Sequence, residues 1–282
     1  MDSASSDPRA GGGAGGGSGV VIVPLDGSDL SESALPVAAR ISAALDSPIT
    51  LLTSGWGSTV ADLESYLAAN AAMLDAPCTT AVVPDTFPAT AITDALRTPG
   101  DVVVMATHGR SGIGRALLGS VAEDLLKRID TAVVLLGPKG SGGAPSSGAP
   151  STGGTLVVTV DGSPRSAMIL PTAARFSRAL DLRVVVVTVG APGGDDHDED
   201  LRRAGAASVG FFRSEGGEAE HQHLVGTDAA AAIIAFAEQQ PAAMIAMATH
   251  GRTGLGRTAL GSTTMKVVHT GPCPVLVERS RS

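Results

Sequence analysis

The chain has 282 residues, a formal net charge of −8 at pH 7 and 43% hydrophobic residues. Its length suffices for two domains of ordinary size. The acidic balance argues against nucleic acid as a partner, because lysine and arginine dominate binding to phosphates. With five Phe, one Trp and one Tyr, the chain also lacks the stacking platforms of single-strand binders. No apolar run approaches the ~20 residues that a membrane span needs, so no membrane partner is expected.

Cysteine usage predicts the compartment. Cys78 and Cys273 fall at non-equivalent places in the two halves of the chain, so a disulfide is not expected. The N-terminus also shows no basic-then-apolar export pattern. A reducing cytoplasm is therefore the expected location.

Two segments rich in glycine and serine divide the chain. Residues 1–19 and 138–154 contain too few apolar groups to form a core, so we expect a disordered tail and an interdomain linker. This division predicts one domain over residues 20–137 and a second over residues 155–279. Each is close to the common domain size.

Within each half, short apolar runs alternate with segments of helical spacing. The runs are residues 20–25, 49–53, 79–83, 101–105 and 131–136, then 155–160, 183–189, 219–225, 242–247 and 274–278. Helical spacing is present over residues 30–45, 60–74, 164–180 and 229–238. Continuous apolar strands indicate burial on both faces, as in a parallel sheet covered by helices. The fold class is therefore α/β, with two doubly wound, five-stranded, parallel-sheet, Rossmann-like domains in tandem.

The two halves repeat each other in sequence. VPLDGS at residues 23–28 matches VTVDGS at residues 158–163, and the stretch 106–120 is a near-copy of 248–262. The first match is separated by 135 positions and the second by 142. The second half therefore has about seven extra residues. We expect them in the acidic, glycine-rich segment around residues 190–200, before the second helix.

The repeated elements should meet at one edge of each sheet, because ligands of parallel sheets bind beyond the carboxyl ends of the strands. Asp26 and Asp161 end the first strands, where a carboxylate can accept hydrogen bonds from ribose hydroxyls. Alternatively, Asp-Gly-Ser forms only a turn, with Ser28 or Ser163 as helix cap. The two roles are compatible. The ends of the second strands, 53–54 and 188–189, offer backbone groups to a base.

The near-copied loops have the pattern of an anion site. Glycines allow backbone N–H groups to turn towards an anion, and arginines supply charge. The helix that follows adds its N-terminal amides and dipole. Ser120 and Glu123 are spaced as a capping box, which Ser262 and Met265 lack. The alternative is a mobile surface loop with solubilising arginines, but its near-verbatim repetition favours the anion site.

Histidines and acidic residues suggest two further possibilities. His108 and His250 have the residue type of a general base, but no partner nucleophile is evident, so we expect them to order the loops. The acidic run 195–200, with His221 and His223, contains metal-ligand types. It occurs in one half only and lacks defined ligand spacing, which favours a solvated loop. Neither a Gly-x-Gly-x-x-Gly motif after the first strand nor a Gly-Lys-Ser/Thr motif is present.

These motifs resemble those of the universal stress protein family in a tandem form. The resemblance rests on VPLDGS, on the two His-Gly-Arg loops with Gly-x9-Gly-Ser, and on GPCPVLV at residues 271–277. It implies an adenine nucleotide alpha hydrolase-like fold with strand order 3-2-1-4-5 and association through the fifth strands. The two domains would form an internal pseudo-dimer, and a homodimer is possible.

The resemblance also implies an ATP site in each half, which Mg²⁺ can accompany, and a stress-regulatory role without turnover. The implied site residues are Pro24, Leu25, Asp26, Ser54, Ala106, Gly109, Arg110, Gly112, Gly119, Ser120 and Val121, with Thr159, Val160, Asp161, Val189, Ala248, Gly251, Arg252, Gly254, Gly261, Ser262 and Thr263. Alanine replaces the first glycine of the family pattern at residues 106 and 248. A nucleotide-free interaction module and a slow ATP hydrolase are the alternatives.

Overall fold

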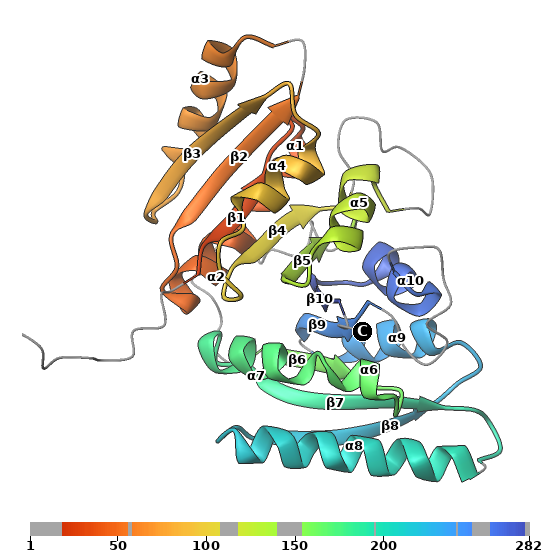
Figure 1. Ribbon diagram of the computed structural model, residues 1–282. Helices are drawn as coiled ribbons and strands as arrows, with labels where there is room; N and C mark the ends of the chain where they lie inside the picture. Colours follow the sequence, from red (N-terminus) through yellow and green to blue (C-terminus); the bar gives the residue numbers. More distant parts are fainter. Residues whose placement is uncertain are drawn as a thin grey trace, which may run out of the picture.

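The computed structural model describes residues 19–55, 58–107, 118–139, 154–194, 196–240, 242–249 and 260–279. Strands and helices alternate through both halves (Figure 1). The first half contains β1 Val21–Pro24, α1 Asp29–Glu32, α2 Leu35–Leu45, β2 Ile49–Gly55, α3 Val60–Ala71, β3 Cys78–Pro84, α4 Pro88–Ala95, β4 Val102–Ala106, α5 Ser120–Arg128 and β5 Ala132–Leu136. The second contains β6 Thr155–Thr159, α6 Pro164–Ala167, α7 Leu170–Ala179, β7 Arg183–Gly190, α8 Asp196–Ser214, β8 Ala219–Val225, α9 Ala229–Gln239, β9 Ala242–Ala248, α10 Ser262–Thr270 and β10 Val275–Glu278.

All the strands form one ten-stranded sheet in the order β3-β2-β1-β4-β5-β10-β9-β6-β7-β8. Each half has the strand order 3-2-1-4-5 with parallel pairing, which confirms the predicted fold class. The halves join where β5 and β10 pair antiparallel, with Leu135 opposite Val275 and Val133 opposite Val277. The chain therefore forms its own pseudo-dimer through the fifth strands, with the two halves stacked along one twisted sheet (Figure 1).

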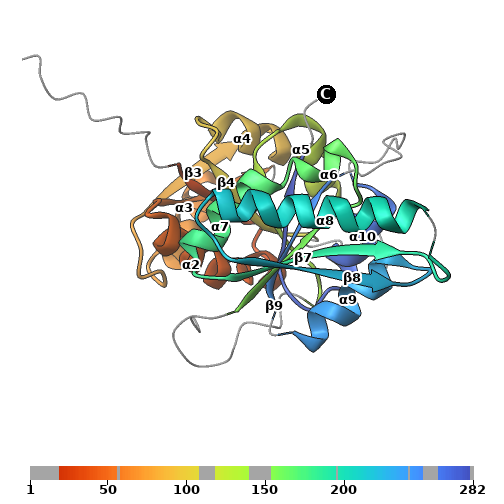
Figure 2. The ribbon, with the colours of Figure 1, turned by 90° about the horizontal axis from the view of Figure 1, so that it is seen from below.

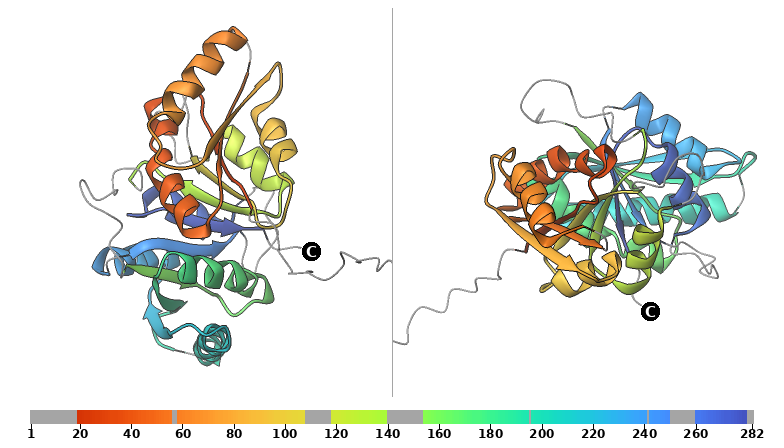
Figure 3. Two further views of the ribbon diagram at one scale, coloured as in Figure 1. Left: turned by 90° about the vertical axis from the view of Figure 1, so that its left-hand side faces the viewer. Right: turned by 90° about the horizontal axis from the view of Figure 1, so that it is seen from above.

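Helices cover both faces of this sheet (Figures 2 and 3). One buried cluster joins alternate strand residues to side chains from α2, α3, α7 and α8, including Phe176 and Phe212. The other cluster involves the opposite sheet face with α4, α5, α9 and α10. Strand residues on both faces are fully buried, as at Val103 and Val104, which explains the continuous apolar runs of the sequence.

Two predicted helices are each divided in the structure. The expected helix over 30–45 is α1 followed by α2, and the one over 164–180 is α6 followed by α7. Pro36 and Pro171 stand in the first turns of α2 and α7. Proline has no N–H and disfavours a helical residue before it, so each longer helix begins anew at this position.

The extra residues of the second half lengthen a helix, so the expectation that they precede the second helix was wrong. Helix α8 has 19 residues, whereas its counterpart α3 has 12. The acidic residues Asp196, Asp198 and Glu199 form the first turn of α8. Negative charge is favourable there because it faces the positive end of the helix dipole. Within the part of the chain that the structure describes, no helix combines the length and apolarity needed to cross a bilayer.

Candidate functional site

The Asp-Gly-Ser turn is built identically in the two halves. The Asp26 carboxylate accepts the Ser28 N–H at 3.0 Å and the Ser28 hydroxyl at 2.6 Å. Asp161 accepts the same groups of Ser163 at 3.0 and 2.6 Å. The glycine between them has a positive φ, +79° at Gly27 and +78° in the second copy, which a side chain would strain. The serine hydroxyls cap α1 and α6, so the predicted capping role is confirmed.

The turns lie at the carboxyl edge of the sheet, beside the ends of the neighbouring strands. The Leu25 N–H donates to the Leu52 carbonyl of β2 at 2.8 Å, and the Val160 N–H donates to the Val187 carbonyl of β7 at 3.0 Å. Pairing of β1 with both β2 and β4 brings the ends of all three strands to one edge. Ser54, near the end of strand β2, has a buried hydroxyl without a hydrogen-bond partner among the described residues.

The ends of the near-copied loops are fastened to each other in both halves. The Gly119 N–H donates to the Thr107 carbonyl at 2.7 Å, and the Gly261 N–H donates to the Thr249 carbonyl at 2.7 Å. These bonds hold the first turns of α5 and α10 directly beside the ends of β4 and β9. Because α5 and α10 begin at Ser120 and Ser262, the next N–H groups have no acceptor within their own helix.

The predicted capping box at Ser120 is wrong. Gly119 is the cap residue of α5, and no side chain accepts a hydrogen bond there. The Glu123 carboxylate instead pairs with Lys127 at 2.8 Å, one turn along the helix. Because Gly261 caps α10 in the same way, the two helix starts are alike. Both therefore begin with N–H groups that no side chain caps.

A threonine distinguishes the second helix start from the first. The buried Thr264 hydroxyl donates to the Ala248 carbonyl at 3.1 Å, whereas the equivalent residue of the first half is Ala122. Ala106 and Ala248, which replace the family glycine, are each 7% exposed at the ends of β4 and β9. Their methyl groups are thus packed within the strand ends.

The described candidate residues fall into three groups. Strand ends hold the buried Leu25, Thr159 and Val160, with Pro24, Ser54 and Val189 half-buried. The turns hold Asp26, which is exposed, and Asp161, which is half-buried. The helix starts hold Gly119, Val121, Gly261 and Thr263, half-buried, and Ser120 and Ser262, exposed. Gly109, Arg110, Gly112, Gly251, Arg252 and Gly254 lie outside the described residues, as do His108 and His250.

Sequence reasoning missed one residue that supports the first turn. The Tyr66 hydroxyl on α3 donates to the Glu32 carboxylate of α1 at 2.9 Å. Burial raises the pKa of Tyr66 to about 12, and the hydrogen bond and charge of Glu32 add to the effect. The Gly27 backbone and Ser31 also contact this hydroxyl. Tyr66 is the chain's single tyrosine, which makes it conspicuous in the composition. Nothing in the surrounding sequence indicates that it contacts the Asp26 turn.

The expectation of a solvated acidic loop around residues 195–200 was also wrong. Asp198 is 3% exposed and lies on α8 with its carboxylate towards His223. The metal alternative finds no support either. Among the residues that the structure describes, no group of three or more His, Cys, Asp or Glu side chains is placed to hold a metal ion.

The fold and its paired turns define a tandem of Rossmann-like α/β domains, each with a candidate site at its strand edge. The sequence profile of the Universal stress protein family matches residues 18–137 and again residues 154–279. The chain therefore belongs to the universal stress protein family, as a tandem two-domain member, and the resemblance is confirmed.

Individual relatives agree with this assignment. A universal stress protein of Methanocaldococcus jannaschii is 49% identical over 45 residues, which cover 16% of this chain and 26% of the relative. A universal stress protein from Archaeoglobus fulgidus superposes with a TM-score of 0.64 at 20% identity, over 93% of this chain and 97% of its own. A functionally unknown protein from Pseudomonas aeruginosa gives 0.65 at 18% identity, over 93% and 92%. At these identities the two solved structures show a shared fold.

Proposed function

We propose that the chain binds ATP, with Mg²⁺ as a possible companion, at the carboxyl edge of each half-sheet. The nucleotide acts as a regulatory ligand in a cytoplasmic stress response. In this proposal Asp26 and Asp161 accept hydrogen bonds from the ribose. The helix starts at Ser120 and Ser262 then receive the phosphates, as the N-termini of helices favour anions.

One observation supports the proposal most strongly: the two halves have the same bonds in the same places. Both carboxylates are oriented by a serine at 2.6 Å, and both helix starts are held at the strand edge by a 2.7 Å bond from a glycine N–H. Other equivalent elements of the two halves are less alike, since the helices α3 and α8 differ by seven residues in length. The turns are thus more alike than the elements that surround them.

No described group near the turns has the environment of a general base, which favours a ligand role over turnover. The Asp26 and Asp161 carboxylates are each engaged by a serine hydroxyl and N–H. The second-strand ends supply Ser54 and Val189, which are not ionisable.

The experiment is equilibrium titration of the full chain with Mg·ATP by calorimetry. We expect saturable binding at two sites. Asp26→Asn and Asp161→Asn should each weaken one site by about tenfold or more, because a charged hydrogen bond contributes roughly 1.5–3 kcal/mol. Asp94→Asn, on the exposed face of α4, is the matched control and should change neither site.

The contrary outcomes are distinct. Absence of saturable binding at about millimolar ATP would favour the nucleotide-free interaction module, since a ligand signal needs an affinity near its working concentration. Chromatography of the titrated nucleotide separates the remaining alternative. ATP recovered intact supports the regulatory role, whereas steady ADP production lost in His108→Ala and His250→Ala would indicate a hydrolase.

A further inference from the structure

A largely buried polar cluster lies between α8 and the strands β7 and β8 of the second half, of which β8 is the edge strand of the sheet. The Thr188 hydroxyl oxygen lies 2.9 Å from His221 Nε2 and 2.9 Å from His223 Nδ1. His223 Nε2 faces the Asp198 carboxylate at 3.6 Å. The Thr188 residue is fully buried, and the side chains of His223 and Asp198 are 10% and 4% exposed. Four polar groups thus form a chain in the interior.

Two glycines allow α8 to pack directly onto this cluster. A Cβ at Gly205 of α8 would lie 2.2 Å from His221 Nε2, and a Cβ at Gly190 would lie 2.1 Å from Asp198 Oδ1. Real Cβ atoms do not approach other atoms so closely, because the repulsion would displace one element. The helix and the strand end are therefore in contact at the cluster, without intervening side chains.

The described residues of the first half form no such cluster at the equivalent positions. Pairing of β7 with β8 places Thr188 opposite His223 and Val186 opposite His221. The equivalent pairs of the first half are Thr53 opposite Val82 and Leu51 opposite Thr80. The threonine is thus present in both halves, and the ionisable groups occur in the second alone.

The hydrogen bonds fit neutral imidazoles. A hydroxyl has one hydrogen, so Thr188 can donate to one ring nitrogen while it accepts from the other. In this arrangement His221 Nε2–H donates to the Thr188 oxygen and the Thr188 hydroxyl donates to His223 Nδ1. His223 Nε2 then faces the Asp198 carboxylate at 3.6 Å, beyond hydrogen-bond distance. A further proton on His221 would place a cation in this half-buried site.

Burial and nearby positive charge oppose protonation of His221, whereas the Asp198 carboxylate faces His223. Helix α8 contributes Asp198 and Arg202, β8 contributes the two histidines, and β7 contributes the neutral Thr188. Helix α9 packs on the other face of β8. Burial lowers the pKa of His221 below its ordinary value, and the positive charge of Arg202, and of His223 whenever that ring is protonated, lowers it further. A histidine that is neutral in the folded state stabilises the fold above its unfolded pKa of about 6.5, and this stabilisation is lost as pH falls below that value.

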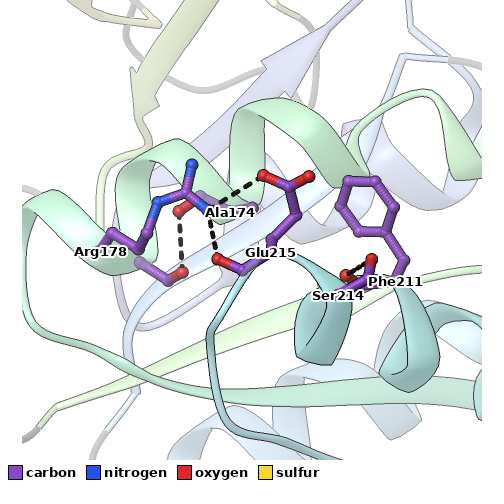
Figure 4. Close-up of polar contacts among 6 residues, drawn as sticks. Ala174, Arg178, Phe211, Ser214 and Glu215 are labelled. Atoms are coloured by element: carbon purple, nitrogen blue, oxygen red, sulfur yellow. Dashed lines mark hydrogen bonds and ion pairs between the residues drawn. The ribbon is translucent and has the colours of Figure 1, made fainter.

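Helix α8 also touches the candidate nucleotide site. Its Leu201 and Ala204 side chains line the space beside Gly162 of the Asp-Gly-Ser turn, at the ordinary van der Waals distances of 3.9 and 3.8 Å from where a Cβ would be. The far end of the helix is fastened elsewhere: Figure 4 shows Arg178 of α7 donating to the backbone and carboxylate of Glu215, at 3.1 and 3.2 Å. Movement at the cluster would therefore be concentrated at the N-terminal part of α8, which covers the turn.

We propose that Thr188, His221, His223 and Asp198 form a proton-sensitive control of the second nucleotide site. Protonation of His221 in mildly acidic conditions releases the N-terminal part of α8 from β7 and β8, and the Asp161 turn then loses the helix that covers it. Nucleotide affinity falls at the second site and is unchanged at the first. This inference rests on the proposed nucleotide binding.

The first test follows α8 by hydrogen–deuterium exchange of the full chain at about pH 7.5 and about pH 5.5, corrected for intrinsic exchange. We expect protection over residues 196–205 to fall about tenfold or more in acid, while that of α3 is unchanged. The double substitution His221→Thr with His223→Val installs the residues of the first half and should remove the pH dependence. His197→Gln, a histidine of α8 outside the cluster, should retain it. Equal protection at both pH values in the wild type would overturn the inference, as would an undiminished pH effect in the double variant.

The second test measures Mg·ATP affinity at the two pH values. The second site should weaken by about tenfold in acid in the wild type, as expected for uptake of one proton, and should remain constant in the double variant. Binding at both sites with no change in acid overturns the inference and leaves the proposed function intact. Absence of binding at either pH contradicts the proposed function itself.

Discussion

Asp101 should be one of the most costly polar residues to replace. It is 1% exposed at the start of β4. One carboxylate oxygen accepts the Val20 N–H at 3.0 Å and the Thr98 hydroxyl at 2.8 Å. The other accepts the N–H groups of Arg97 at 2.5 Å and Thr98 at 2.9 Å. The residue thus joins the segment before β1 to the turn between α4 and β4.

The substitution Asp101→Asn keeps the shape of the side chain but replaces one acceptor oxygen with an NH2 group and removes the charge. Its NH2 group would face either two backbone N–H donors or one N–H and a hydroxyl that can turn to accept. The second arrangement costs less, yet it still leaves the Val20 N–H without an acceptor, at roughly 1–3 kcal/mol. Loss of charge on the remaining bonds adds about 1 kcal/mol. We therefore expect the free energy of unfolding to fall by about 2–4 kcal/mol.

Urea unfolding at about neutral pH, followed by circular dichroism, measures this change. Burial would raise the pKa of Asp101, but the hydrogen bonds from Arg97, Thr98 and Val20 lower it below its ordinary value overall. The carboxylate therefore stabilises the fold above the unfolded pKa of about 4, and the difference between wild type and variant should shrink as pH falls through the folded pKa. Asp75→Asn, at an exposed position, is the control. A loss below about 0.5 kcal/mol at neutral pH would refute the reasoning.

Three further outcomes follow from single groups. Gly137→Ala should destabilise the chain by more than about 2 kcal/mol in urea unfolding, because its Cβ would lie 1.9 Å from a backbone carbonyl of α10 where the two halves meet. Gly210→Ala is the control, because a Cβ at this position of α8 would have no other atom within 4 Å. It should be neutral or stabilise the chain by up to about 1 kcal/mol. Thiol labelling should modify Cys78 before Cys273, whose pKa burial raises to about 12, and labelling of both at one rate in the native protein would contradict the buried position. Tyrosinate absorbance should appear in the folded chain near pH 12, since burial raises the pKa of Tyr66 to about 12. The free energy of unfolding should therefore fall as pH rises above the unfolded pKa of about 10. Tyr66→Phe should abolish the absorbance change.

The sequence alone predicted the layers of the fold well, because its signals were local. Continuous apolar runs such as 101–105 coincide with fully buried strands such as β4, and the two Asp-Gly-Ser turns have the predicted caps. The strand order came with the family resemblance, since periodicity does not determine which strands are neighbours.

The errors arose where tertiary contacts override local pattern. Asp198 belongs to an acidic run with the composition of a surface loop, yet its burial depends on a histidine 25 positions later on an edge strand. The spacing of Ser120 and Glu123 fits a capping box, but a bond from Gly119 to the end of β4 moves the cap by one residue. Local spacing contains no information on either partner.

The central claim is that the duplicated turns form two adenine nucleotide sites in one chain. Native mass spectrometry of the full chain with increasing ATP tests it most directly, since it counts bound ligands on each molecule. For the wild type we expect the number of bound nucleotides to rise to two per chain. For Asp161→Asn, at the lowest ATP concentration that saturates the wild type, we expect it to stop at one. A chain that stays free of nucleotide at about millimolar ATP, while its fold is intact by circular dichroism, would contradict the account.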